Sequence, residues 1–140
     1  MIDKETINEK LENFKKYVGY LKEYRKFSLE DIKKDYTLQG AIRYYLQVAC
    51  KCVIDICEII ISGLGLPKPD TARDSIEMLG ENGILSLEFS LKISKMAGLR
   101  NILVHEYAKI DISEIYNHLQ KKLDDFSQFA KLIATWINKI

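Results

Sequence analysis

Apolar residues recur every three or four positions along most of the chain, which is the spacing of one face of an α-helix. The first such stripe predicts a helix over about residues 4–26, and it consists of Ile7, Leu11, Phe14, Val18 and Leu21. The last stripe begins after residue 111 and consists of Ile112, Ile115, Leu119, Leu123, Phe126, Ala130, Ile133 and Ile137. No stretch alternates apolar and polar residues as a half-buried strand does. The pattern therefore predicts an all-α fold.

Capping and helix-breaking residues mark where the second helix begins and ends. Ser28 with Asp31 three residues later has the spacing of a capping box, which predicts the start of a long helix. The sequence GLGLPKP, residues 63–69, combines glycine and proline and is the one clear loop. We therefore expect the second helix to run from residue 28 to about residue 62.

Three further helices are expected after this loop. Asp70 or Thr71 caps a short third helix that ends near residue 83, and Ser86 opens a fourth that reaches about residue 107. Asp111, read as a helix cap rather than a catalytic group, begins the fifth. We expect one domain over residues 1–140, an up-and-down bundle of about five helices built on the first, second and fifth.

The second predicted helix is apolar on nearly all sides between Val48 and Ile61. Such a helix is either central in the bundle or packed against a second subunit. Its three cysteines, Cys50, Cys52 and Cys57, form no CxxC pair and have no histidine pair nearby. We expect them to pack in the core as free thiols, which fits a reducing compartment, and to bind no metal.

A row of tyrosines, Tyr17, Tyr20 and Tyr24, lies beside the apolar stripe of the first helix. Ordinary packing at the edge of the core explains them, and a homodimer surface is the alternative, since tyrosine is enriched at protein interfaces.

Composition and charge narrow the possible functions. The chain is 47% hydrophobic and 29% charged, with a formal net charge of +1. A sequence-blind DNA-binding protein normally carries a basic excess, so this balance argues against one but leaves room for a small cationic site. No apolar run approaches the ~18 residues of a membrane span, and MIDKETINEK at the N-terminus does not have the pattern of a signal peptide. We expect a cytoplasmic protein.

An arginine, an asparagine, a histidine and a tyrosine stand among apolar residues such as Ile102 and Leu103 in the fourth predicted helix, within LRNILVHEYAKID, residues 99–111. At 100° per residue Arg100, Asn101, His105 and Tyr107 fall within about 160° of arc, so their long side chains can converge. A packed histidine beside a surface arginine is the simpler interpretation, but the clustering favours a site.

The chemistry that suits this set is cleavage of a phosphodiester. An imidazole titrates near neutral pH and can accept a proton from a ribose 2′-hydroxyl, while a guanidinium stabilises negative charge on phosphate oxygens. Asn101 can orient either the imidazole or the substrate. Cleavage needs both a base and an acid, and a two-fold dimer would bring two copies of His105 and of Arg100 into one cleft.

The segment RNILVHEY has the form R-x4-H-x-Y, with asparagine after the arginine, and resembles the signature of the HEPN superfamily. The likeness is closest to the HepT-like toxins that pair with MntA-like minimal nucleotidyltransferase antitoxins. It extends over nearly the whole chain through SLED, AIRYYLQVA, GLGLPKPDTARDSIEMLGENGIL and DISEIYNHLQKKLDDFSQFA. One departure is Lys51, where the family often has an acidic residue.

The resemblance implies an all-α homodimer that acts as a metal-independent ribonuclease toxin of a type VII toxin–antitoxin pair, without a cofactor. Arg100 and His105 would be catalytic in a composite cleft, and RNA, with tRNA as one candidate, would be the substrate. It also implies that the antitoxin adenylylates Tyr107 and thereby silences the toxin. An AMP group there would add bulk and negative charge beside Arg100.

Several smaller features have two interpretations. Lys51, Asp55 and Glu58 form the polar stripe of the second helix; a solvated face is the default, and Asp55 is the best candidate for an acidic group that orients Arg100 or His105. His118 and Glu106 read as surface residues.

Two other functions remain open. One is a catalytically idle HEPN module that binds a nucleotide or serves as a scaffold for its nucleotidyltransferase. The other is a plain helical oligomer in which the polar cluster only fixes register. The presence of Arg100, Asn101 and His105 together favours the ribonuclease.

Overall fold

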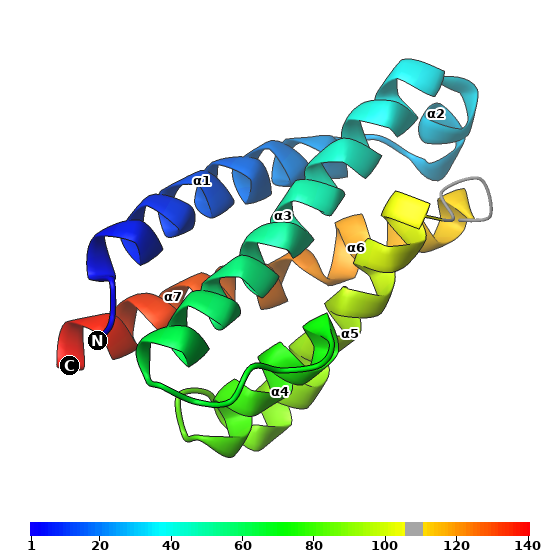
Figure 1. The fold of residues 1–140 in the computed structure, drawn as a ribbon. Helices are drawn as coiled ribbons and strands as arrows, with labels where there is room; N and C mark the ends of the chain where they lie inside the picture. The colour runs from blue at the N-terminus through cyan, green and yellow to red at the C-terminus, as the bar shows by residue number, and fades with distance from the viewer. Residues whose placement is uncertain (106–110) are drawn as a thin grey trace.

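A computed structural model describes residues 1–105 and 111–140, with only the backbone of His105 (Figure 1). This part of the chain forms seven α-helices and one 3-10 helix and contains no strand, which confirms the all-α prediction. In chain order the elements are α1 (Lys4–Glu23), η1 (Tyr24–Lys26), α2 (Leu29–Lys34), α3 (Tyr36–Gly63), α4 (Ala72–Glu81), α5 (Leu87–His105), α6 (Ile112–Lys121) and α7 (Leu123–Lys139).

The second predicted helix is in fact two helices, α2 and α3, separated at Asp35. The capping box of Ser28 and Asp31 is present and starts α2 as expected. Asp35 then adopts an extended conformation, and its carboxylate accepts a hydrogen bond from the backbone N–H of Leu38 at 3.1 Å. This bond satisfies one of the free N–H groups at the start of α3, so Asp35 ends one helix and caps the next. The prediction of a single helix over residues 28–62 was therefore wrong.

The fifth predicted helix is also divided, at Lys122. Asp111 caps α6 through a hydrogen bond from the N–H of Ser113, as expected. Lys122 (φ −108°, ψ −10°) ends α6 without any side-chain cap, and α7 starts at the next residue. Because the apolar stripe continues across Lys122, the periodicity alone does not reveal this break.

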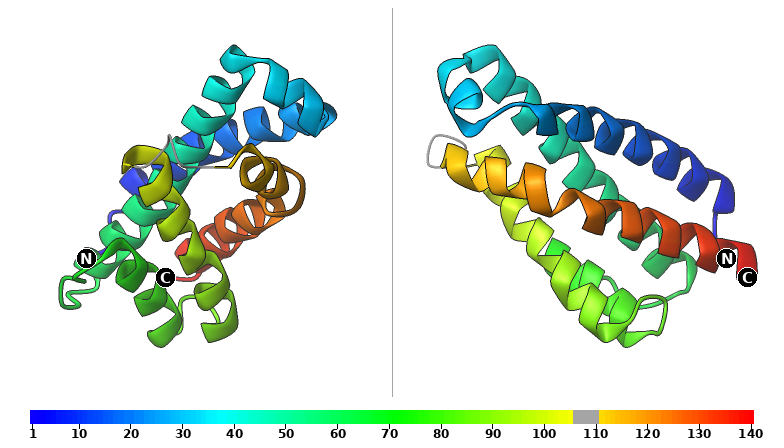
Figure 2. Two further views of the ribbon diagram at one scale, coloured as in Figure 1. Left: turned by 90° about the vertical axis from the view of Figure 1, so that its right-hand side faces the viewer. Right: turned by 180° about the vertical axis from the view of Figure 1, so that it is seen from behind.

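Helix α3 is central within the chain, which decides between the two explanations of its apolar surface. It contacts α1 on one side and α4 and α5 on the other, with α2 and α6 toward its N-terminal end (Figures 1 and 2). Cys50 and Cys57 are completely buried among these helices, and Cys52 is nearly so. The apolar character of α3 therefore needs no second subunit to explain it.

Aromatic side chains hold α1 against its neighbours. Phe14 of α1 makes edge-to-face contacts with Phe126 and Phe129 of α7, with ring centroids 5.5 and 5.9 Å apart. On the other side of α1, three half-buried tyrosines surround Tyr45 of α3 at 5.2 to 6.1 Å: Tyr17, Tyr20 and Tyr24. These contacts confirm packing at the edge of the core.

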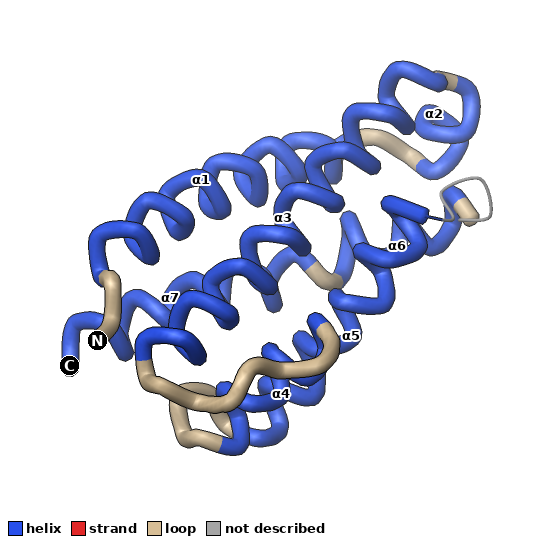
Figure 3. Tube along the Cα trace, viewed as in Figure 1, coloured by secondary structure: helices blue, strands red, loops and turns tan. Residues whose placement is uncertain are grey.

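Helices α4 and α5 form a closely packed hairpin below α3 (Figure 3). Thr71 caps α4 by accepting from the N–H of Asp74 at 3.0 Å. Gly80 of α4 lies so close to Ser90 of α5 that a Cβ at position 80 would come within 2.6 Å of the Ser90 Cβ. None of the helices in residues 1–105 and 111–140 is both long and apolar enough to cross a bilayer.

Candidate active site

Helix α5 carries the polar cluster, and two side-chain contacts together with its packing fix its position. The Ser86 hydroxyl accepts from the N–H of Phe89 at its start, and Lys92 forms a 3.1 Å ion pair with the buried Asp125 of α7. Together with the packing on α3 and α4, these contacts make α5 a firm support for its C-terminal half. That half contains Arg100, Asn101 and His105.

Arg100 lies on the side of α5 that faces α3. It is half-buried, and its Nε has no hydrogen-bond partner among the described residues. Its guanidinium lies close enough to Cys50 to stabilise the thiolate, but burial dominates and raises the pKa of Cys50 to about 12. Cys50 is therefore a neutral thiol at physiological pH and does not neutralise the arginine. The Nε itself is out of reach of solvent, so an anion would bind the other N–H groups of this half-buried guanidinium.

Asn101 lies on a different side of α5 and is exposed. It lines a groove of about 300 Å³ between the start of α4 and the middle of α5, together with Thr71, Ala72, Arg73, Ser94, Lys95, Ala97 and Gly98. Within one chain the structure thus directs Arg100 toward α3 and Asn101 toward α4.

His105 follows Asn101 by four positions, so the helical register places its backbone on the Asn101 side of α5. The side chain of His105 lies outside what the structure describes, and so do Glu106 and Tyr107. Roles for His105 and Tyr107 therefore stay predictions.

Asp55 is explained by other partners. Its Oδ2 accepts from Lys51 at 2.8 Å and from Lys10 of α1 at 3.4 Å, on the side of α3 that packs against α1. No hydrogen bond or ion pair between Asp55 and Arg100 is present among the described residues. Asp55 thus has a local role in joining α3 to α1, and its support of the site stays a prediction.

His118 is not the surface residue that the sequence suggested. It is half-buried on α6, with a buried Nδ1 that has no hydrogen-bond partner among the described residues. Burial lowers the pKa of His118, and Lys122 lowers it further, against a smaller opposing effect of Glu114. The imidazole therefore prefers to be neutral. The apolar spacing of α6 did not predict this, because His118 lies beside the stripe and not in it.

The structure also identifies Arg73 and Lys95 as neighbours of the polar cluster, which sequence reasoning missed. They become neighbours only because α4 folds back along α5, and no local pattern signals it. No group of three or more histidine, cysteine, aspartate or glutamate side chains within residues 1–105 and 111–140 is arranged to hold a metal ion.

Comparison with known proteins decides the family. The profile described as "Ribonuclease HepT-like" matches residues 7–133, which is most of the chain. The chain belongs to the HepT-like ribonuclease family. This confirms the resemblance drawn from the R-x4-H-x-Y segment and its flanks.

Two relatives of this chain are HepT nucleases. The mRNA nuclease HepT of Shewanella oneidensis is 37% identical over 101 residues, which are 72% of this chain and 76% of the relative. The tRNA nuclease HepT of Aphanizomenon flos-aquae is 30% identical over 131 residues, 94% of this chain and 89% of the relative.

A solved structure shows the HepT-like fold in a complex. The tri-AMPylated HEPN toxin of Shewanella oneidensis, bound to its MNT antitoxin, superposes on this chain with a TM-score of 0.85. It is 31% identical, and the match covers 96% of this chain and 99% of that one. The helix order and packing described above are therefore those of a HepT-like ribonuclease.

Proposed function

We propose that this HepT-like chain is a metal-independent endoribonuclease toxin of a type VII toxin–antitoxin pair. The observation that carries the proposal is the state of Arg100, a guanidinium held on a rigid helix with a buried, unpaired Nε and no counter-ion among the described residues. It precedes His105 by five positions on the same helix. A phosphate of RNA is the partner that this arrangement fits.

The reaction follows from the chemistry of the two side chains. His105 takes the proton of a ribose 2′-hydroxyl, whose oxygen attacks the adjacent phosphorus and forms a cyclic phosphate. Arg100 stabilises the negative charge that develops on the phosphate oxygens. The departing 5′-oxygen then takes a proton from a second acid. In our proposal Asn101 holds the substrate or the imidazole, and no step uses a metal ion.

We further propose that the active form is a homodimer with a composite cleft. The second acid would be the partner subunit's His105. By helical register, positions 100 and 105 lie about 140° apart on α5, so a second copy of α5 facing the first would bring an Arg100 and a His105 to the same phosphate from opposite sides. The apolar surface of α3 no longer contributes to this argument, since α3 is covered within the chain.

Regulation is proposed through an MNT-type nucleotidyltransferase antitoxin that transfers AMP to Tyr107. The AMPylated state and the antitoxin complex of the Shewanella relative support this proposal. Tyr107 follows the end of α5 by two positions in the sequence. An AMP group there would bring negative charge near Arg100 and compete with an RNA phosphate.

The test is cleavage of total RNA and of tRNA by purified protein, with and without EDTA. His105→Ala should reduce cleavage by at least ~100-fold while helical content by circular dichroism is unchanged. His118→Ala, the other histidine of the chain, is the matched control and should cleave normally. EDTA should have no effect. A folded His105→Ala protein with full activity would reject the proposal, and an inactive unaltered protein would favour the idle scaffold.

A further inference from the structure

The groove between α4 and α5 has the charge of a phosphate-binding surface. Two of its eight lining residues, Arg73 and Lys95, are exposed cations, and Thr71 adds a hydroxyl group. None of the eight is a carboxylate. The chain as a whole is nearly neutral, with 21 basic and 20 acidic residues, so this grouping is a local property. A groove of this composition attracts an anion and offers it hydrogen-bond donors.

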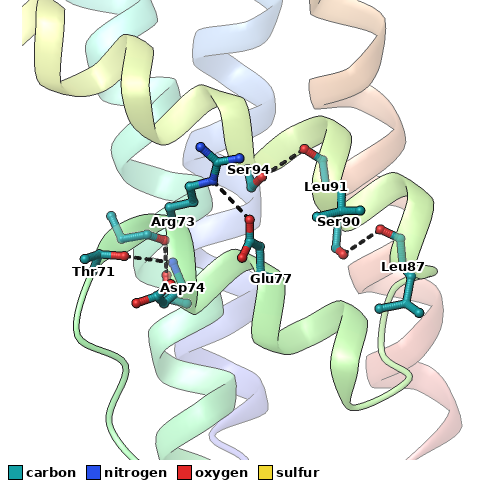
Figure 4. Close-up of polar contacts among 10 residues, drawn as sticks. Thr71, Arg73, Asp74, Glu77, Leu87, Ser90, Leu91 and Ser94 are labelled. Carbon is teal, nitrogen blue, oxygen red and sulfur yellow. Dashed lines mark hydrogen bonds and ion pairs between the residues drawn. The ribbon is translucent and has the colours of Figure 1, made fainter.

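Arg73 is held so that much of its guanidinium stays available. Its Nε donates to Glu77 one turn further along α4 at 3.0 Å. Figure 4 shows the two terminal nitrogens of Arg73 pointing away from Glu77, on the side of Ser94 and α5. The ion pair therefore orients the guanidinium across the groove and leaves its terminal N–H groups for another acceptor.

The groove leads toward the proposed site of cleavage. Positions 94, 98, 101 and 105 are spaced by three and four, so they follow one another along one face of α5. Ser94, Gly98 and Asn101 line the groove, and His105 is next in the series. A strand of RNA whose phosphate is attacked at His105 would thus continue along this face toward Lys95 and Arg73.

Gly98 keeps the groove open at its centre. A Cβ built at Gly98 has no other atom within 4 Å, so the position faces open space. Around it the walls are firm, because the Ser94 hydroxyl bonds to the carbonyl of Leu91 at 2.8 Å and Thr71 caps α4. The floor is therefore a small residue between two fixed helices.

We propose that this groove binds the RNA backbone beside the scissile phosphate, with Arg73 and Lys95 each contacting a phosphate. The inference rests on the proposed ribonuclease function and extends it from the cleavage site to the neighbouring nucleotides. In this arrangement Asn101 lies between the cleavage site and the groove. Arg73 and Lys95 position the strand and take no part in proton transfer.

The test measures RNA binding and cleavage in two comparisons, each between a groove variant and its matched control. The first comparison uses two double variants, each of which loses two positive charges. The groove pair is Arg73→Gln with Lys95→Gln, and the α7 pair is Lys131→Gln with Lys139→Gln on two exposed lysines outside the groove. Binding is measured in a His105→Ala background with a fluorescent single-stranded RNA at several salt concentrations. Cleavage is measured in chains that keep His105.

The groove pair should raise the dissociation constant by about tenfold or more and make the slope of log K against log salt less steep by about 1.4, as expected for two lost phosphate contacts. It should raise KM and leave kcat nearly unchanged. The α7 pair should leave KM, kcat and the slope near those of the unaltered chain. The same results for both pairs would overturn the inference.

The second comparison keeps the charge of the groove and changes only the volume of the side chain at position 98. Gly98→Leu fills the groove and should weaken RNA binding, whereas Gly98→Ala should bind normally, because its methyl group meets no other atom. Equal binding by Gly98→Leu and Gly98→Ala would also count against the groove.

The outcomes separate this inference from the proposed function. If the unaltered chain neither binds nor cleaves RNA, the proposed function fails and the inference with it. If it cleaves RNA and the groove variants match their controls, only the inference fails. Groove variants that lose affinity for the nucleotidyltransferase but not for RNA would place the groove in the antitoxin interface, contrary to our proposal.

Discussion

Arg100 of α5 lies beside Cys50 of α3, and the two residues do not neutralise each other. Burial raises the pKa of Cys50 to about 12 despite the nearby guanidinium, so the thiol stays protonated while the arginine stays charged. The Nε of Arg100 has no hydrogen-bond partner among the described residues. The neutral Cys50 thiol therefore lies beside the guanidinium without neutralising it, so the charge of Arg100 stays available for a phosphate.

Complementation between two inactive chains tests the composite cleft. Arg100→Ala and His105→Ala proteins should each lose RNA cleavage, and a mixed dimer should recover part of it, because its composite cleft would again hold one Arg100 and one His105, whereas each parent dimer lacks one of these residues altogether. The measurement is RNase activity after the two proteins are mixed and allowed to exchange subunits. Light scattering that shows a monomer at micromolar concentration would contradict the dimer directly.

Tyr107→Phe tests the regulatory site. A phenol titrates near pH ~10 and is a poor proton carrier at neutral pH, so loss of the hydroxyl should leave most RNase activity. The variant should resist silencing by the nucleotidyltransferase and ATP, since no oxygen remains to receive AMP. Intact mass before and after incubation is the measurement. AMP additions on Tyr107→Phe equal to those on the unaltered chain would move the modification to another residue.

The cysteines should be unreactive in the folded protein. Burial raises the pKa of all three thiols, Cys50, Cys52 and Cys57, and the thiolate is the reactive form. With a chromogenic disulfide reagent at pH 8, the folded chain should react slowly, at a rate set by opening of the structure, and all three thiols should react at once in guanidinium chloride. Rapid reaction of one folded-state thiol would show a site more open than described.

His118 should make the protein less stable in mild acid. Its pKa is lower in the folded chain than in the unfolded one, mainly through burial and then through Lys122. Stability from neutral His118 is therefore present above the unfolded pKa of about 6.5 and is lost as the pH falls toward the folded pKa. The melting temperature should fall more between pH 7.5 and 5.5 for the unaltered chain than for His118→Gln. Parallel curves would contradict the assignment, since His105 is present in both proteins.

Sequence periodicity predicted the helices and the core well because the apolar stripes are long. It missed the break at Asp35, although an aspartate followed by a helical pattern is a capping signal and the buried stripe skips there from Ile32 to Leu38. At Lys122 the backbone stays close to helical values and no side chain caps α7, so the only sequence signal is the change from Lys121 and Lys122 to Asp124 and Asp125.

The candidate site was predictable only in part. The spacing of Arg100, Asn101 and His105 in the sequence pointed to phosphodiester chemistry, and family membership supports it. The unpaired Nε of Arg100 and the groove of Arg73 and Lys95 depend on how α5 packs on α3 and α4. Such contacts between distant segments leave no local pattern to read.

The close approach of Gly80 to Ser90 constrains how this sequence can diverge. The atoms that a Cβ at position 80 would meet first belong to the buried Ser90 side chain, so a larger residue there must either lose that side chain or move α4 away from α5. That movement would also change the groove that Arg73 and Lys95 line. Among orthologues that keep this groove, we therefore expect glycine at position 80 and a small residue at position 90, even where the surrounding core residues have been exchanged.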